Sequence, residues 1–372
     1  MDKRLALVKL ENLDPLANFI SKRKINPIQL SLWIFILNIV VDSTLGFLFK
    51  VFISSNPQRP GILQDPIALT FDFIIQPLIC GAYYWTSIGS NELFERIFNS
   101  GVLKDTSKIN DLIAETHANY KKYHILALAT GIGSVFSVAQ VAAYMGWVPW
   151  KTFSGYLYIY PAMSFARLPF WFITFYGVVY GVINISFSCS LLEGIFKNPG
   201  NIKINILHPD GCGGLALIGQ YATRTGYVIA PIGLYASLSA LIELSHGNLE
   251  NAYPIQLFIL AYILLAPIVF IFPIWEAHSA MLQKKNEELI KLSNLYNKKY
   301  KEVTEDNNID PKITLDILLK IKTLHKETLE QYPTWPVRLY NVRQFITTIV
   351  SSLLPILLSF AIDIIKFAFT KN

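Results

Sequence analysis

Long apolar stretches alternate with shorter polar ones along most of this 372-residue chain. A helix of about 20 residues crosses the hydrocarbon core of a bilayer, and several apolar stretches reach that length with few charged positions. The pattern predicts an all-α, polytopic membrane protein with about seven spanning helices. The expected spans are Leu30–Val51, Pro66–Ile88, His124–Trp147, Leu168–Leu192, Tyr227–Leu244, Pro254–Ile274 and Phe345–Phe369.

The polar segments divide the chain around these spans. Residues 1–27 are expected to be an N-terminal segment, 28–275 the first six spans with their loops, and 344–372 the last span with the C-terminus. A smaller polar stretch, Ser90–Tyr123, predicts a pair of helices broken at Gly101.

The longest polar segment, 276–343, predicts a helical hairpin. Apolar residues recur at spacings of three, four and seven from Leu282 to Val303, which is the pattern of one helix face. A turn at Thr304–Pro311 separates them from a second stripe, and that stripe consists of Ile313, Ile317, Ile321 and Leu324.

Composition and charge agree with a membrane location and orient the chain. The chain is 52% hydrophobic and only 16% charged, whereas soluble proteins average about 25% charged residues. Of the 32 Lys and Arg residues, 26 fall in the N-terminal segment and in every second connection, the hairpin included. Positive residues stay on the cytoplasmic side, so the N-terminus and the hairpin are expected in the cytoplasm.

The same charges bear on partners and location. Residues 279–333 hold ten Lys against nine acidic residues, a balance that argues against a nucleic-acid partner. The lipid bilayer is then the expected partner, and the organisation is compatible with a homo-oligomer. The usage of Ile, Asn and Lys favours a bacterial source and hence the inner (plasma) membrane.

One loop stands out for its chemistry, His208-Pro209-Asp210-Gly211-Cys212-Gly213-Gly214 before the fifth span. Asp210 is suited to cap a helix running on through Leu215, and the glycines allow backbones to approach closely or amides to face an anion. His208, Asp210 and Cys212 can each bind metals, but no partner motif such as HExxH accompanies them, so no metal site is predicted. A capped re-entry into the membrane and a binding or catalytic loop are the two interpretations.

This loop resembles the HPDxxGGL signature of a group of bacterial polytopic membrane proteins without an assigned activity. The Pro333-Thr334-Trp335-Pro336 turn before the last span is similar to those proteins as well. The resemblance covers about residues 165–365 and implies nothing about chemistry. Gly211 and Cys212 occupy its variable positions.

Four polar residues within or beside the spans are the other candidates: Asn38, Asp42, Asp72 and Arg167. Charges in hydrocarbon are costly, so such groups line a path or pair with one another. Asn38 and Asp42, four residues apart, share a helix face. The acids could line an ion or proton path, or an ion pair such as Asp72 with Arg167 could lock helices together.

Three functions are compatible with these patterns. No Walker A, GxSxG, GxGxxG or potassium-filter stretch is present, and the sequence assigns neither a catalytic residue nor a cofactor. A channel- or transporter-like conduit is the leading hypothesis. The alternatives are a membrane-embedded enzyme that uses the His208–Cys212 loop, and a membrane sensor or effector that acts through its hairpin.

Overall fold

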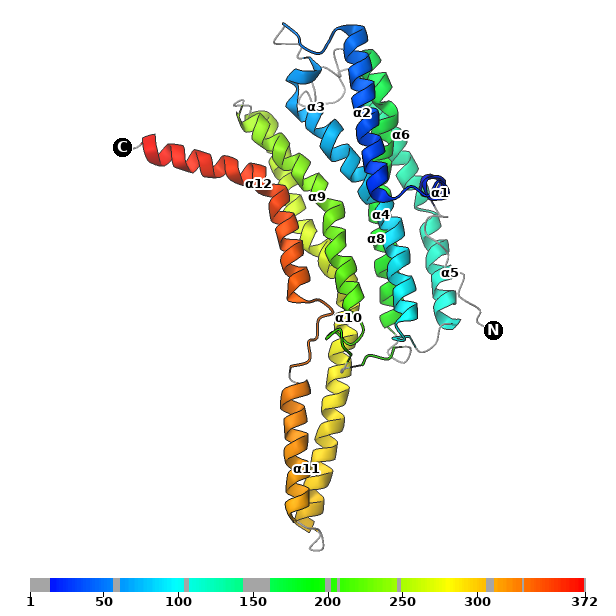
Figure 1. Cartoon of the computed structure of the whole chain (residues 1–372), viewed down its shortest axis with the longest axis vertical. Coiled ribbons are helices and arrows are strands. Elements are labelled where there is room, and N and C mark those ends of the chain that lie inside the picture. The colour runs from blue at the N-terminus through cyan, green and yellow to red at the C-terminus, as the bar shows by residue number, and fades with distance from the viewer. Residues whose placement is uncertain are drawn as a thin grey trace.

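The computed structural model is elongated, with a helical bundle at one end and a long helical projection at the other (Figure 1). It describes residues 14–55, 61–103, 107–142, 161–197, 202–205, 208–245, 249–305, 311–329 and 331–370. Within these ranges the chain is all-α, and the only β pairing is an isolated bridge between Leu103 and Ile202. The α-helices are α1 (Pro15–Lys22), α2 (Pro27–Phe49), α3 (Pro66–Thr70), α4 (Gln76–Asn99), α5 (Ser107–Lys121), α6 (His124–Ala142), α8 (Pro161–Phe196), α9 (Ala216–Ser245), α10 (Leu249–Glu305), α11 (Pro311–Leu324) and α12 (Leu339–Thr370).

Six of the described helices are long and apolar enough to cross a membrane. They correspond to six of the seven expected spans, and the remaining one, His124–Trp147, coincides with α6 as far as Ala142. Its last residues, 143–147, lie outside the described part of the chain. The prediction of an all-α polytopic membrane protein is therefore confirmed.

Several helices continue beyond the apolar runs that predicted them. The first helix expected in Ser90–Tyr123 is the end of α4, which continues to Asn99 before a turn at Gly101, whose φ is +71°. The helix expected to run through Leu215 begins instead at Ala216. Hydropathy marks only the part of a helix that lies in lipid, so it underestimates helices that extend into water.

The helix starts follow from local capping chemistry. The Asn26 side chain accepts a hydrogen bond from the Gln29 amide, and the Gln29 side chain accepts one from the Asn26 amide, so both groups cap α2. At the start of α3 the Asp65 side chain alone caps the helix, by accepting a hydrogen bond from the Ala68 amide. Proline follows each cap, at a position where the missing N–H costs nothing.

Prolines inside helices explain two irregularities. A π-helical turn over Phe71–Ile75 joins α3 to α4 immediately before Pro77, because a proline cannot donate to the carbonyl four residues earlier. Pro355 lies within α12, and Figure 1 shows that this helix bends sharply along its length.

Helix α2 places its polar residues inward and its apolar residues outward. Its buried positions are Ile34, Asn38, Asp42 and Gly46, each four residues from the next. Large apolar side chains such as Ile28 and Phe47 are exposed on its other faces. A helix in a soluble protein shows the reverse arrangement, so the exposed apolar faces of α2 are suited to contact with lipid.

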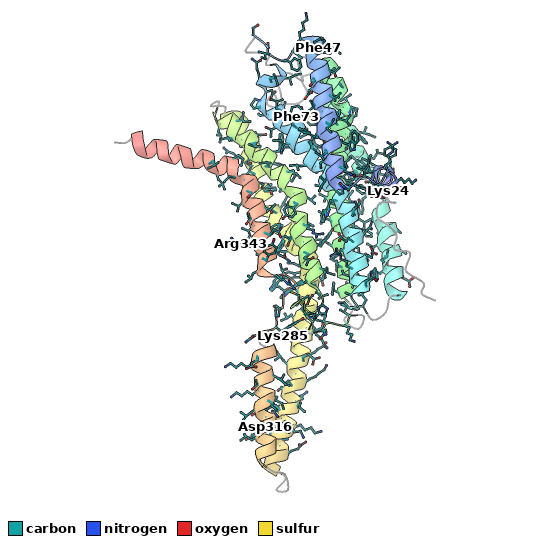
Figure 2. All side chains as sticks on the ribbon, viewed as in Figure 1. Lys24, Phe47, Phe73, Lys285, Asp316 and Arg343 are labelled. Carbon is teal, nitrogen blue, oxygen red and sulfur yellow. The ribbon has the colours of Figure 1, made fainter. Side chains whose placement is uncertain are left out.

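The projection is formed by the second half of α10 and by α11. Helix α10 has 57 residues, about 85 Å at 1.5 Å per residue, and it continues through residue 275 without a break. After the segment 306–310, which lies outside the described residues, α11 packs back along it, and a π-helical turn, His325–Leu329, follows. The Lys285 and Asp316 side chains in Figure 2 mark the base and the far part of this hairpin.

The largest buried apolar cluster lies where the bundle meets the hairpin. It unites the ends of α4 and α8, the start of α9 and the middle of α10 with Tyr332 and Phe345. Phe270 of α10 stacks on Phe345 of α12 with ring centroids 4.4 Å apart. The base of the hairpin is thus anchored in the core.

Candidate functional site

The intramembrane polar residues converge on one arginine. Arg167, on α8, is fully buried, with 0% of its surface exposed. One guanidinium nitrogen forms an ion pair with Asp42 of α2, and the other lies 2.9 Å from Asp72 Oδ1 in the π-helical turn. The pair expected between Asp72 and Arg167 is present, and Asp42 joins it.

Amide side chains extend this network across the bundle. Arg167 Nη1 donates to Asn38 Oδ1 at 3.2 Å, and Asn38 donates to the Asp72 carbonyl and, at 3.0 Å, to Gln76 Oε1. Gln76 in turn donates to Thr174 at 2.8 Å. The acids are therefore held in an ion-pair network that ties α2, the π-helical turn, α4 and α8 together, and they do not form a row of acceptors along a path.

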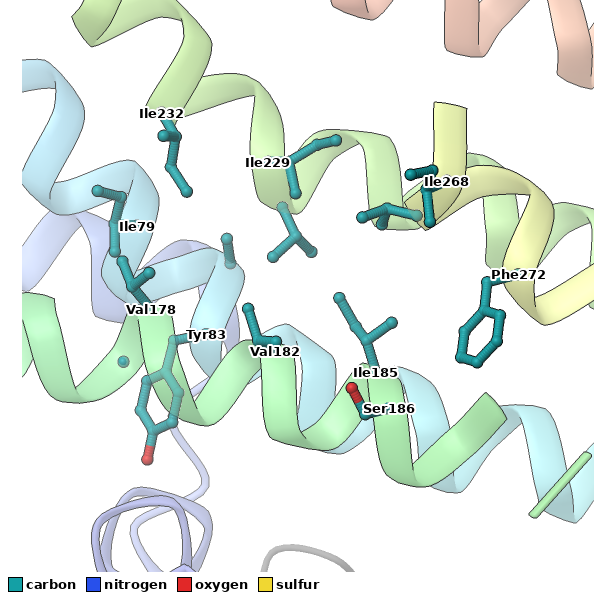
Figure 3. A pocket seen from close by; sticks show the side chains of 14 residues that line it. Ile79, Tyr83, Val178, Val182, Ile185, Ser186, Ile229, Ile232, Ile268 and Phe272 are labelled. Atoms are coloured by element: carbon teal, nitrogen blue, oxygen red, sulfur yellow. The ribbon is translucent and has the colours of Figure 1, made fainter. Parts of the chain in front are cut away.

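An apolar cavity lies between α4, α8, α9 and α10 (Figure 3). Its volume is about 210 Å³, and its walls are mainly branched aliphatic side chains such as Val178, Val182 and Ile232. The Tyr83 hydroxyl points away from the cavity, and no acidic or basic side chain lines it. This cavity offers no polar continuation from the arginine network.

The HPD–GGL loop closes on itself around Asp210. Asp210 Oδ1 accepts hydrogen bonds from the amides of Cys212 and Gly214 at 2.8 and 3.0 Å, and Oδ2 accepts one from the Ala216 amide at 3.1 Å. His208 Nδ1 lies 2.8 Å from the same carboxylate. Asp210 thus satisfies the free amides where α9 begins.

Glycine is required in this loop by conformation and by space. Gly211, Gly213 and Gly214 all have positive φ, which side chains disfavour. A Cβ at Gly213 would also lie 2.3 Å from the Tyr332 hydroxyl. Tyr332 reaches the loop from the base of the hairpin, and its hydroxyl is buried without a hydrogen-bond partner among the described residues.

The chain returning from the hairpin is clamped to this loop. Arg338 donates to the Asp210 carbonyl at 2.8 Å, and Lys285 of α10 donates to the Tyr332 carbonyl at 3.2 Å. His278 Nδ1 lies 2.7 Å from the Thr334 carbonyl, and its ring stacks on Trp335 at 3.9 Å. We call residues 208–216, 278–285 and 331–338 together the junction.

The chemistry of the loop favours a structural role. Partial burial acts to raise the pKa of Asp210, but the hydrogen bonds from Cys212, Gly214 and Ala216 hold it below its ordinary value. Burial, and then the Asp210 charge, raise the pKa of the Cys212 thiol, which therefore stays protonated and is a poor nucleophile. Among the described residues no group of three or more His, Cys, Asp or Glu could hold a metal ion.

Another buried carboxylate, Asp14, was not predicted from the sequence. Asp14 caps α1, accepts a hydrogen bond from the Tyr176 hydroxyl at 2.6 Å and another from Tyr83, and is fully buried. The Asp14-Pro15 pair is a recognisable helix start, and that signal could have located it. Its tyrosine partners lie on distant helices and carry no local signal.

The fold and these clusters define an all-α, multi-pass integral membrane protein. The chain matches no known family model, none of the curated proteins and no solved structure.

The Asp210 cap gives a pH-dependent prediction. Asp210→Ala should lose about 1–2 kcal/mol of stability at neutral pH, because the amides at the start of α9 lose their acceptor. A carboxylate with a lowered folded pKa stabilises fully above its unfolded pKa of about 3.9 and ceases to do so as pH falls through the folded value. Thermal unfolding of the purified protein at pH 7 and pH 3 should therefore show a deficit that shrinks in acid. The exposed Asp316→Ala variant is the control, and an undiminished midpoint for Asp210→Ala at pH 7 would contradict the role.

Proposed function

We propose that this protein is a bacterial inner-membrane effector or sensor that acts through its projecting hairpin, and that two copies associate along that hairpin. The observation that carries the proposal is an apolar face left open on a rigid element outside the bundle. The hairpin lies in the cytoplasm in this proposal, as the distribution of Lys and Arg favours.

The open face includes residues of both hairpin helices. Ile290 on α10 is 61% exposed, and Leu315 and Leu319, one turn apart on α11, are 58% and 55% exposed. A groove of about 440 Å³ between the helices is lined by Ile290, Tyr296 and Ile321 among others. Large apolar side chains that are exposed on both helices of an element outside the bundle are typical of an interaction surface.

A second copy is the partner that the charges favour. Lys284 and Lys291 pair with Glu288, and Lys320 pairs with Asp316, so the hairpin neutralises most of its own charge. A surface without a net field does not select an oppositely charged partner. Copies inserted in one membrane orientation also present the same face at the same height, as a twofold interface requires.

The junction supplies a route from the bundle to the hairpin. Tyr332, Thr334 and Arg338 hold the returning chain against α9 and α10. A change in the tilt of α9 relative to α10 would therefore move the base of the hairpin. The resemblance of this loop to the HPDxxGGL signature remains a prediction. If it holds, the proteins that carry the signature would have the same junction.

The other functions find less support. The enzyme hypothesis needs His208 and Asp210 at a cavity, but Asp210 is occupied by the α9 cap and none of the cavities described above includes either residue. The conduit hypothesis needs open acids, but Asp42 and Asp72 are paired with Arg167. Ion flux in proteoliposomes that Asp42→Asn alters would reinstate the conduit.

Cysteine cross-linking in native membranes tests the hairpin association. The native Cys80, Cys189 and Cys212 are buried, so a single introduced cysteine dominates the reaction. Leu319→Cys should cross-link most chains into dimers with a short bis-maleimide, because two hairpins meet along this face.

The matched control is Lys320→Cys, one residue further along α11 and exposed with a 72% accessible side chain. It turns by about 100° from Leu319 and should stay largely monomeric. Equal dimer yields at the two positions, or no dimer from Leu319→Cys, would refute the proposed face.

A further inference from the structure

A crevice runs over α4 between α2 and α9, and it changes character along its length. One part is lined by Ile28 of α2, Leu78 and Ala82 of α4, and Pro231 of α9, with a volume of about 360 Å³. Trp85 and Arg224 line this part and also an adjoining hollow that is lined further by Glu92, Arg96 and Gln220. The two share a border, so an apolar slot leads directly into a polar, charged end.

The antiparallel direction of α4 and α9 explains why the lining changes from apolar to charged along the crevice. Helix α4 runs from Leu78 to Arg96 while α9 runs the opposite way, from Gln220 to Pro231, so the apolar residues face each other and so do the polar ones. The polar end lies near the start of α9 and hence near the junction. Trp85 and Tyr227 stand between the two ends, where amphipathic aromatic side chains favour the bilayer interface.

The charged end has an excess of positive charge. Arg96 and Arg224 both pair with Glu92, the latter at 3.6 Å, so two guanidinium groups share one carboxylate. The side chains of both arginines are about half exposed, at 51% and 47%. A guanidinium group can bind a phosphate through two parallel hydrogen bonds, and here it has donors to spare.

We propose that this crevice binds one anionic glycerophospholipid, with its phosphate on Arg224 and Arg96 and one acyl chain in the slot between α2 and α9. The slot opens towards the bilayer, where the surrounding material is hydrocarbon chains. The net positive end selects an anionic headgroup over a zwitterionic one. The proposal is independent of the hairpin association.

Lipid competition on the purified full-length chain tests this assignment. Phosphatidylglycerol and phosphatidylcholine with identical chains are offered together, and retained lipid is counted by native mass spectrometry. One basic residue near a headgroup contributes about 1 kcal/mol, so the wild type should prefer phosphatidylglycerol at least about five-fold. Arg224→Gln should reduce that preference to nearly none, whereas Glu92→Gln, which frees both arginines, should increase it.

Arg343→Gln is the matched control, since Arg343 is an exposed arginine of α12 that lines neither part of the crevice. It should keep the wild-type preference, and every variant should elute as a single species. An unchanged preference in Arg224→Gln, or an equal loss in Arg343→Gln, would overturn the site in favour of diffuse surface charge. Displacement of the bound lipid by soluble glycerol phosphate would likewise overturn it, since the acyl chain would then contribute nothing.

Discussion

Arg167→Ala is expected to be the most damaging single substitution in this protein, with a loss of about 3–5 kcal/mol of stability. It would leave the carboxyl groups of Asp42 and Asp72 buried without their cation, and buried unpaired charges are costly both in protein interiors and in hydrocarbon. Thermal unfolding in detergent and the yield of monodisperse protein would measure the loss. The exposed Arg343→Ala is the control and should change little.

A combined variant separates the effect of the lost ion pairs from the effect of the lost side-chain volume. Arg167→Met with Asp42→Asn and Asp72→Asn removes every charge of the network and should recover most of the lost stability, since replacing both partners of a buried pair is often nearly neutral. If Arg167→Ala alone is as stable as the wild type, the network is not the lock that we describe.

The second large effect is expected at Gly219, on the first turns of α9. A Cβ there would lie 2.1 Å from the Pro336 carbonyl oxygen, which is backbone and cannot rotate away. Gly219→Ala should therefore push the returning chain off α9 and cost about 1–3 kcal/mol or more. We expect limited proteolysis to cleave the hairpin base faster, and the Leu319→Cys cross-link to decline.

Gly133→Ala is the control for this substitution. A Cβ at Gly133, on α6, meets nothing within 4 Å, so alanine should be tolerated there and can even favour the helix. Unchanged proteolysis in Gly219→Ala would mean that the junction does not fix the hairpin base.

Much of the fold could be predicted because its signals are local. A predominantly apolar stretch of about 20 residues identifies a membrane helix wherever it occurs, and six of the described helices are long and apolar enough to cross a membrane. The cost of burying charge in hydrocarbon also favoured an ion pair between Asp72 and Arg167, although the two residues lie far apart in the sequence.

The helix boundaries were harder to predict from the sequence. Helix α10 crosses from the membrane into the hairpin without a break, and α4 passes the end of its apolar run. Hydropathy changes at the lipid surface, whereas backbone hydrogen bonding continues for as long as no proline, glycine or cap interrupts it. The pattern therefore indicated the apolar parts of the helices but not where the helices end.

By itself, the sequence determined that this is an all-α polytopic membrane protein with a charge-balanced hairpin, since hydropathy and helical periodicity depend only on neighbouring residues. Only the tertiary structure decided that Asp42 shares Arg167, that Asp14 meets Tyr176, and that Arg338 clamps the HPD–GGL loop. Each of these contacts joins residues more than a hundred positions apart. Their geometry depends on how the helices cross, and no local pattern encodes that.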